Sequence, residues 1–444
     1  MTEATTDPAT VIGPPRVTDP RPDTDPGPDA VAPRSLWRNR PFRALWAGQT
    51  VSGFGDRVTE LALPLIAITV LGAGATAVGA LTAAVWLPYL GALFVGTWVD
   101  RRTHKRRLLI VADLVRAALL LSLPVAYLLG VLSLVQLFVV ALLTGAGQVL
   151  FTMAYQSFFV ALVPAESYID ANSKLSLSRA SSFVGGPALG GVLIQALTAP
   201  VAVLVDALSF LGSAVLIRRI AVPEVAPKTT QASMLSMVRE GLRLVMRHPI
   251  LRASLVSTTT VNFFSFIAFA VAILFASREL HLSAGAIGLA LGIGALGAVA
   301  GAALAPWLSR LIGVGPTAII GSALFPAPFA LMAFASGSTA TRIAWLAGAE
   351  LLSSIGVMLL DVNLNAIITH ATPDGARGRQ AGAYSAINYG IRPLGALAGG
   401  ALGTAIGLRG ALVVAGIGGT FAAVWLLASP VRRIVTLTGS PTAS

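Results

Sequence analysis

The segment Gly186-Pro-Ala-Leu-Gly-Gly-Val-Leu193 has a counterpart 209 residues later, Gly395-Ala-Leu-Ala-Gly-Gly-Ala-Leu402. The same shift places Pro164 on Pro373, and the segment Ala77-Val-Gly79 on Ala286-Ile-Gly288. Because one shift aligns three separated segments, the sequence predicts an internal repeat. The chain is therefore expected to consist of two equivalent halves.

Long apolar runs fill most of both halves. Of the 444 residues, 55% are apolar and only 11% are charged, against roughly 25% charged in a soluble domain. The runs extend from about residue 43 to residue 430, which is room for about twelve spans of ~20 residues with their connections. They do not alternate in polarity as the strands of a membrane β-barrel do. The sequence predicts an all-α polytopic membrane protein with twelve transmembrane helices in two parallel-repeat six-helix halves.

Composition divides the chain into five parts. We expect a disordered cytoplasmic tail at 1–40, six-helix halves at 41–217 and 251–430, a cytoplasmic linker at 218–250 and a second cytoplasmic tail at 431–444. The expected spans are 44–71, 78–99, 108–129, 132–162, 172–197, 201–217, 251–276, 284–308, 317–335, 343–368, 380–406 and 411–427.

The linker contains apolar residues at helical spacing opposite charged ones. Met234, Val238, Leu242, Val245 and Met246 lie opposite Arg239, Glu240, Arg243 and Arg247. This pattern predicts an amphipathic helix in the cytoplasmic interface.

The basic residues that give the net charge of +12 are distributed as the expected topology requires. Of the 31 Lys and Arg residues, 24 fall in the N-terminal tail and in alternate loops. The positive-inside bias therefore predicts a multi-pass protein of the cell membrane with both termini in the cytoplasm. The basic residues indicate contact with the lipid bilayer and not with nucleic acid.

Several kinds of site find no support in the sequence. The chain has no Cys, which excludes disulfides and thiolate metal ligands. It has no GxxxxGKS or GxxxxGKT segment, which excludes an ATP-driven pump within this chain, and no HExxH or GxSxG segment. We expect no catalytic residues, no bound metal and no cofactor.

The loop Gly96-Thr-Trp-Val-Asp100-Arg-Arg-Thr-His-Lys105-Arg-Arg-Leu108 resembles the motif GxLxDRxGRRxxL of the major facilitator superfamily. Gly96, Asp100, Arg101 and Lys105 are in register, whereas Trp98, Thr103 and His104 depart from the pattern. The resemblance implies that the acid and the bases lock and release the cytoplasmic contact between the halves. The alternative is an ordinary basic cytoplasmic loop.

The fifth span is similar to the end of that superfamily's antiporter motif, GPxxGG. The matching residues are Gly186, Pro187, Gly190 and Gly191. Glycines allow helices to approach closely, and the proline disrupts a backbone hydrogen bond and bends the helix. Ordinary packing of small residues is the alternative.

Three further segments resemble the drug-efflux branch, which includes macrolide and multidrug exporters and the enterobactin exporter. They are Ser52-Gly-Phe-Gly-Asp56-Arg57, Asp113-Leu-Val-Arg116, and Pro164 followed eight residues later by Asn172. The resemblance covers residues 40–430 and implies export of small molecules, often driven by protons. The arginine that many drug:proton antiporters carry in span 4 is missing here.

Ionisable residues inside the spans must face protein, water or one another, because each is costly in lipid. The proton-coupling candidates are Asp56, Glu60, Glu350 and Asp361, and the intramembrane arginines are Arg57, Arg179 and Arg392. Asp56 and Glu60 are four residues apart and share a helix face, although Asp56 and Arg57 could equally form a structural pair. Asp113 and Arg116 are expected to form a charge pair in span 3, at a gate or in packing, and Asp206 is expected to be structural.

Together these features predict a secondary active transporter that works by alternating access. It is expected to export small amphipathic molecules, of drug, antibiotic or siderophore type, in exchange for protons, and to function as a monomer. Phe263, Phe264, Phe266 and Phe269 are candidates to line its cavity. The alternatives are a proton-coupled uptake symporter, a channel and, more remotely, a polytopic membrane enzyme.

Overall fold

The computed structural model describes residues 36–221 and 234–436, and within these ranges the chain forms helices and short connections without a β-strand. By length and composition, ten of the described helical segments could cross a membrane. Helices α1 and α14, which carry Asp56, Arg57, Glu60 and Arg392, add two further segments of 26 and 29 residues. The predicted twelve-helix membrane fold is confirmed.

Seven helices, which make up six spans, form the N-terminal half. They comprise α1 (Arg40–Leu65), α2 (Ala75–Trp86), α3 (Ala92–Asp100), α4 (Lys105–Leu128), α5 (Leu134–Leu162), α6 (Tyr168–Leu197) and α7 (Ala199–Arg218). Helices α2 and α3 belong to one span, which is interrupted by a tight turn at Leu87–Gly91 that contains Pro88. A proline lacks the backbone N–H of a regular helix, which accounts for this break.

The C-terminal half repeats this arrangement after α8 (Met234–Arg247). It comprises α9 (Pro249–Arg278), α10 (Ala284–Ile312), α11 (Val314–Leu324), α12 (Ala327–Met332), α13 (Thr339–Ala371), α14 (Arg377–Ala405), α15 (Gly407–Thr420) and α16 (Ala422–Leu427). The first residues of α1 and α9, of α2 and α10, of α4 and α11, and of α6 and α14 are each 209 residues apart. The shift found in three short segments therefore relates the halves helix by helix.

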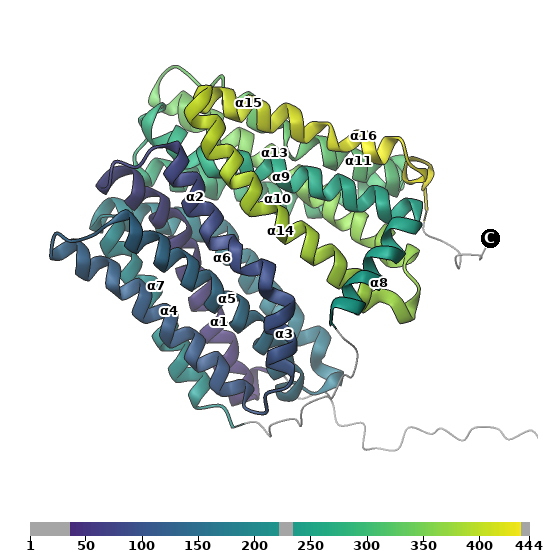
Figure 1. Ribbon diagram of the computed structural model, residues 1–444, viewed down its shortest axis with the longest axis horizontal. Coiled ribbons are helices and arrows are strands. Elements are labelled where there is room, and N and C mark those ends of the chain that lie inside the picture. Colours follow the sequence, from purple (N-terminus) through teal and green to yellow (C-terminus); the bar gives the residue numbers. More distant parts are fainter. Residues whose placement is uncertain (1–35, 222–233, 437–444) are drawn as a thin grey trace, which may run out of the picture.

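The two halves meet at one side of the molecule and diverge toward the other, as Figure 1 shows. We call the side that holds the end of α7 and the start of α9 the linker side, and the opposite side the far side. The main contacts between the halves are α2 with α14 and α6 with α10. Toward the linker side, α3 of the N-terminal half keeps a smaller contact with α8 and α14 of the C-terminal half.

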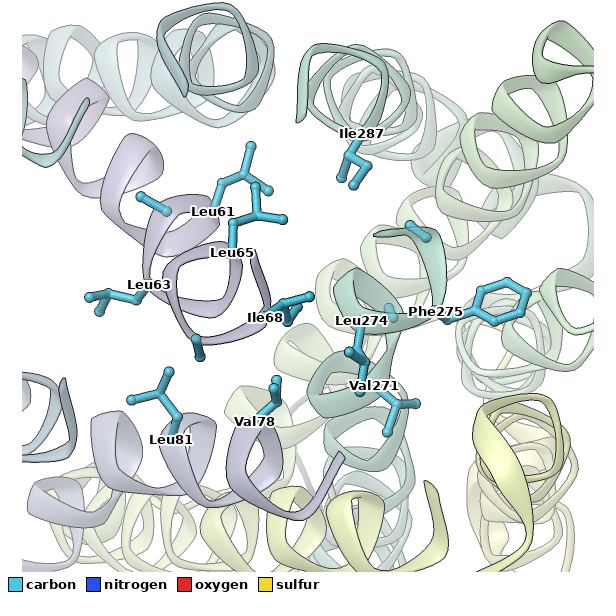
Figure 2. Packing of buried hydrophobic residues seen from close by; sticks show 14 of the residues in the cluster. Leu61, Leu63, Leu65, Ile68, Val78, Leu81, Val271, Leu274, Phe275 and Ile287 are labelled. Carbon is cyan, nitrogen blue, oxygen red and sulfur yellow. The ribbon is translucent and has the colours of Figure 1, made fainter. Parts of the chain in front are cut away.

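A buried apolar cluster joins the halves near the far side. Ile68 and Val78 come from the N-terminal half, and Val271 and Leu274 come from α9. Figure 2 shows these side chains in the space between α1, α2 and α9. The burial of apolar surface in this cluster and the close contact of small residues fix the end of the molecule at which the halves meet.

Helix α8 is present where the linker pattern predicts it, but it packs against protein. Val245 is fully buried beside Leu251 and Leu255 of α9, and Glu240 forms an ion pair with Arg379 of α14 at 3.1 Å. The apolar stripe therefore covers the C-terminal half instead of lying free in the interface. The side chains of Met234 and Val238 lie outside the described part.

Candidate functional site

Two glycine contacts close the far side. An ideal Cβ on Gly79 of α2 would lie 2.7 Å from the Cα of Gly400 of α14. On the opposite flank, an ideal Cβ on Gly191 of α6 would lie 2.9 Å from the Cα of Gly288 of α10. Only glycine permits backbones to approach this closely. Because Gly79 corresponds to Gly288 and Gly191 to Gly400 in the repeat, the two contacts are equivalent.

Two polar contacts accompany the glycines. The hydroxyls of Thr76 and Thr404 are 2.8 Å apart. The Gln195 Oε1 atom accepts hydrogen bonds from the Gly285 backbone N–H at 3.0 Å and from the Ser283 hydroxyl at 3.1 Å. Thr76 corresponds to Gly285 and Gln195 to Thr404 in the repeat. We call the four glycines and these polar contacts the far-side gate.

The antiporter-like motif lies within this interface. Gly186 contacts the side chain of Arg57, and an ideal Cβ on Gly190 would lie 3.2 Å from the Cα of Val58. The Pro187 carbonyl lies directly against Gly288. The motif therefore joins α6 to α1 and to α10, which is the close helix approach that its small residues predict.

A cavity of about 250 Å³ lies between α2 of one half and α9, α13 and α14 of the other. Its lining mixes aromatic, amide, hydroxyl and charged side chains. These are Trp86, Thr258, Val261, Asn262, Ser265, Phe266, Phe269, Phe325, Val357, Leu360, Asp361 and Arg392. Such a lining can hold a molecule that has both an apolar body and polar groups.

Arg392 is the basic residue of this cavity. Its guanidinium carbon lies 4.4 Å from the ring centroid of Tyr389, 4.5 Å from that of Trp86 and 5.2 Å from that of Phe266. Its Nε atom donates a hydrogen bond to the Asn262 Oδ1 atom at 3.0 Å. The rings and the amide stabilise a charge that lies inside the membrane-spanning region.

The four predicted coupling acids have different surroundings. Asp56 accepts a hydrogen bond and ion pair from Arg116 at 2.6 Å, and Glu60 forms an ion pair with Arg57 at 2.6 Å. Although four residues apart on one helix, these acids face different partners, and Asp56 does not pair with Arg57. Among the described residues, Glu350 and Asp361 form neither an ion pair nor a hydrogen bond through their carboxylates.

The predicted charge pair of span 3 requires correction. Arg116 reaches across to Asp56 of α1 and lies over the ring of Phe210, with 3.7 Å between its guanidinium carbon and the ring centroid. Asp113 is buried on the same helix, and its Oδ2 atom has no hydrogen-bond partner among the described residues. Arg116 is long enough to pair with a neighbouring helix in preference to a residue one turn away.

Asp206 fastens α7 to α1. It is buried, and it accepts hydrogen bonds from Thr59 of α1 and from Ser209. Gly55 of α1 lies directly against its carboxylate. These contacts account for a buried acid in α7 and support its structural interpretation.

The motif loop lies on the linker side. Gly96 packs toward α5, since an ideal Cβ there would lie 3.3 Å from the Met153 Sδ atom. Lys105 donates a hydrogen bond to the Val99 carbonyl, whereas Asp100 and Arg101 are exposed. Helix α3, which leads into this loop, contacts α8 and α14 of the opposite half, so the loop lies beside the interface between the halves.

Arg179 lies outside the cavity, and only some of the candidate phenylalanines line it. Arg179 is exposed on α6 and donates to the Ser176 hydroxyl at 3.1 Å. Phe266 and Phe269 line the cavity, whereas Phe264 packs against Gly418 and Gly419 of α15, and Phe263 packs beside Gly395. Two of the four expected aromatic lining residues are therefore not lining residues.

Sequence reasoning missed four residues around Arg392. They are Trp86 and Tyr89 of the N-terminal half, and Asn262 and Tyr389 of the C-terminal half. The rings of Tyr89 and Tyr389 stack with centroids 5.1 Å apart and so join the halves. The sequence feature that could have indicated them is a Trp, Tyr or Asn side chain, which carries a polar group, within an otherwise apolar run.

Comparison with known proteins assigns this fold to transporters. A family profile described as "Transmembrane secretion effector" matches residues 31–442. The chain is 27% identical over 235 residues to the uncharacterized MFS-type transporter YfiS of Bacillus subtilis (strain 168). That alignment covers 52% of this chain and 55% of YfiS, so the chain spans about half the length of the curated relative it matches.

Solved structures share the fold over nearly the whole chain. The nucleoside transporter NupG has a TM-score of 0.70 at 11% identity and covers 88% of this chain and 99% of its own. A bacterial homologue of the iron transporter ferroportin, 19% identical, has a TM-score of 0.68 in its inward-facing state, covering 89% of this chain and 99% of its own. Its outward-facing state scores 0.56, with coverage of 87% and 98%. These proteins are transporters and not enzymes.

Proposed function

Since this chain belongs to the transmembrane secretion effector family of major facilitator transporters, we propose that it exports small amphipathic molecules from the cell in exchange for protons. The observation that carries this proposal is the cavity between the halves, together with the far-side gate that joins the same two halves. Its aromatic, amide and charged lining suits a molecule with an apolar body and a polar group. The family description and the efflux-like segments support the outward direction.

The linker side is the cytoplasmic side in this proposal, so both termini are cytoplasmic. The basic loops support this orientation, because Lys and Arg are retained on the cytoplasmic side of a membrane. The higher similarity to the inward-facing state of the ferroportin homologue, 0.68 against 0.56, also supports a cavity that opens to the cytoplasm. Substrate would enter from the cytoplasm or the inner leaflet and leave when the gate opens.

The far-side gate is suited to reversible opening. Glycine contacts depend on close approach and not on interlocked side chains, and the polar contacts of Gln195 and Thr404 can exchange for bonds with water. Because the contacts are repeat-equivalent, rocking of one half about the other separates both together. The same motion would bring the Asp100 loop toward the opposite half and close the linker side.

Glu350 is the acid best placed for proton coupling. It lies on α13 against Gly294 of α10, a helix that contributes to the gate, and it has no ionic partner among the described residues. It can therefore take up and release a proton without breaking an ion pair. Asp56 and Glu60 would each have to leave an arginine at 2.6 Å. Asp361, next to Arg392 in the cavity, is the second candidate.

A direct test compares efflux from cells that express or lack the protein, using a panel of amphipathic antibiotics and dyes with and without a protonophore. Expression is expected to lower accumulation of some compounds, and the protonophore is expected to remove the effect. Counterflow in proteoliposomes then separates a carrier from a channel, because only a carrier exchanges labelled for unlabelled substrate saturably. Uptake that depends on the proton gradient would support the symporter instead.

A further inference from the structure

We infer that the cavity binds a small organic carboxylate with an aromatic or other flat apolar body, and that Arg392 holds the carboxylate. This inference rests on the proposed transport function and specifies its substrate class. Arg392 and Asp361 are the two charged residues in the cavity lining. Whether the cavity favours an anionic or a cationic ligand therefore depends on which of these two side chains is held in position with free hydrogen-bonding groups.

The guanidinium of Arg392 is held in place but only partly satisfied. Its Nε atom donates to the Asn262 Oδ1 atom at 3.0 Å, while its two terminal nitrogens form no hydrogen bond within the described ranges. These two nitrogens form the fork that matches a carboxylate with two parallel hydrogen bonds. The free donors thus define the shape and the charge of the missing partner.

Asn262 is itself fixed, so the orientation of Arg392 is built into the helices. The Asn262 Nδ2 atom donates to the Thr258 carbonyl at 2.8 Å and to the Asn388 Oδ1 atom at 3.3 Å. With its nitrogen engaged twice, the amide must present its oxygen to Arg392. Such preorganisation lowers the cost of binding, because the arginine does not have to be ordered by the ligand.

The internal repeat supports the same ligand independently. Arg57 lies over the ring of Phe183 at 5.3 Å, and Arg392 lies over the ring of Phe266 at 5.2 Å. Arg57 and Phe266 occupy equivalent positions, as do Phe183 and Arg392, because each pair is 209 residues apart. The same cation–π contact therefore occurs in both halves with its partners exchanged.

The two arginines differ in their counter-charge. In the N-terminal half, Glu60 forms an ion pair with Arg57 at 2.6 Å. The equivalent position in the C-terminal half is Phe269, which lines the cavity. Arg392 thus has an apolar surface where its counterpart has an acid. A ligand that brings a carboxylate and a flat apolar body supplies the missing charge and covers Phe269.

Asp361 is less prepared to receive a cation. Within the described ranges, no side chain donates to its carboxylate or fixes its position, and Arg392 in the same cavity would repel a positive ligand. The rings that could surround a cation, Trp86 and Tyr389, already lie against the guanidinium. An ionised Asp361 also weakens the binding of an anion, so its removal is expected to strengthen it.

Binding is tested by calorimetric titration of the purified full chain with 1-naphthoate, its neutral analogue 1-naphthamide and the cation 1-naphthylmethylammonium. Wild type is expected to bind 1-naphthoate at least about tenfold more tightly than either analogue. Arg392→Gln is expected to remove this preference, Arg392→Lys to weaken 1-naphthoate severalfold, and Asp361→Asn to strengthen it severalfold. Arg310→Gln is a matched control, because Arg310 is an exposed arginine of α10 that does not line the cavity.

The inference is overturned if wild type does not prefer 1-naphthoate, or if Arg392→Gln binds it as tightly as wild type does. If Arg392→Gln does not purify as a folded protein, the inference is overturned if Arg392→Lys binds 1-naphthoate as tightly as wild type does. Arg392-dependent binding without 1-naphthoate counterflow in proteoliposomes would support this site and contradict the proposed transport. Counterflow of another compound without 1-naphthoate binding would overturn this site and leave transport intact.

Discussion

Gly191 of α6 and Gly288 of α10 are in direct contact across the two halves, and an ideal Cβ on Gly191 would lie 2.9 Å from the Cα of Gly288. Their repeat equivalents, Gly400 and Gly79, form the same contact on the other flank. Two of the three aligned pairs of segments that reveal the internal repeat thus form the contacts of the far side. In the proposed transport cycle, these contacts belong to one of the two end states.

The ion pair between Asp56 and Arg116 is expected to be structural. Asp56→Asn would leave Arg116, whose side chain is only 8% exposed, without its counter-charge. We expect a loss of about 1–3 kcal/mol in the free energy of unfolding, measured by thermal unfolding in detergent. Glu60→Gln removes the more exposed pair with Arg57 and is expected to cost under about 1 kcal/mol. Equal losses in both variants would contradict this difference.

Glu350 is expected to carry the coupling proton. Glu350→Gln should abolish efflux driven by the proton gradient and preserve downhill exchange of substrate, because the amide removes the titrating group but leaves the cavity unchanged. Efflux with and without a protonophore is the measurement, and Glu60→Gln, which removes the more exposed ion pair, is the matched control. Uphill, protonophore-sensitive efflux by Glu350→Gln would move the coupling site to Asp361.

Asp100 is expected to act when the linker side closes. Asp100→Asn should lower transport severalfold while expression stays normal, because its carboxylate is exposed on the linker side in this state and is proposed to contact the opposite half in the other. Asp170→Asn is the control, since that exposed acid pairs with Lys174 within α6. If Asp100→Asn transports at the wild-type rate, the loop is an ordinary basic cytoplasmic loop and not a gate.

The orientation predicted from the basic loops can be read with reporter fusions. Fusions at Gly130, between α4 and α5, and at His248, between α8 and α9, should report opposite sides of the membrane, with His248 in the cytoplasm. Signals from the same side at both positions would contradict the topology.

Much of the fold could be predicted because two sequence patterns extend over long stretches of the chain. Apolar runs locate the spans, and the shift of 209 residues correctly relates the two halves. The breaks inside spans could not be located, since Pro88 ends α2 in a tight turn whereas Pro187 remains within a continuous α6. Whether a proline breaks or only bends a helix depends on its neighbours in space.

The site was less predictable because its contacts join distant parts of the chain. Spacing indicated Asp113 as the partner of Arg116, but the pair is formed with Asp56, 60 residues away. The surroundings of Arg392 depend on Trp86 of the opposite half, and no local pattern brings these two residues together. Contacts between residues of opposite halves can be identified only from the folded structure.

Alternation between two end states can be tested by spin-label distances, and the absence of Cys makes every introduced label specific. One pair, Val131→Cys with Ala340→Cys, reports the far side, and a second, Glu166→Cys with Gly375→Cys, reports the linker side. Each pair joins repeat-equivalent positions in the two halves.

The decisive comparison is wild type against Gly288→Leu, which places a side chain where the backbones of α6 and α10 meet. If the halves alternate, Gly288→Leu is expected to lengthen the far-side distance and to shorten the linker-side distance relative to wild type. Distances that stay unchanged, or that shift in the same direction on both sides, would contradict alternation.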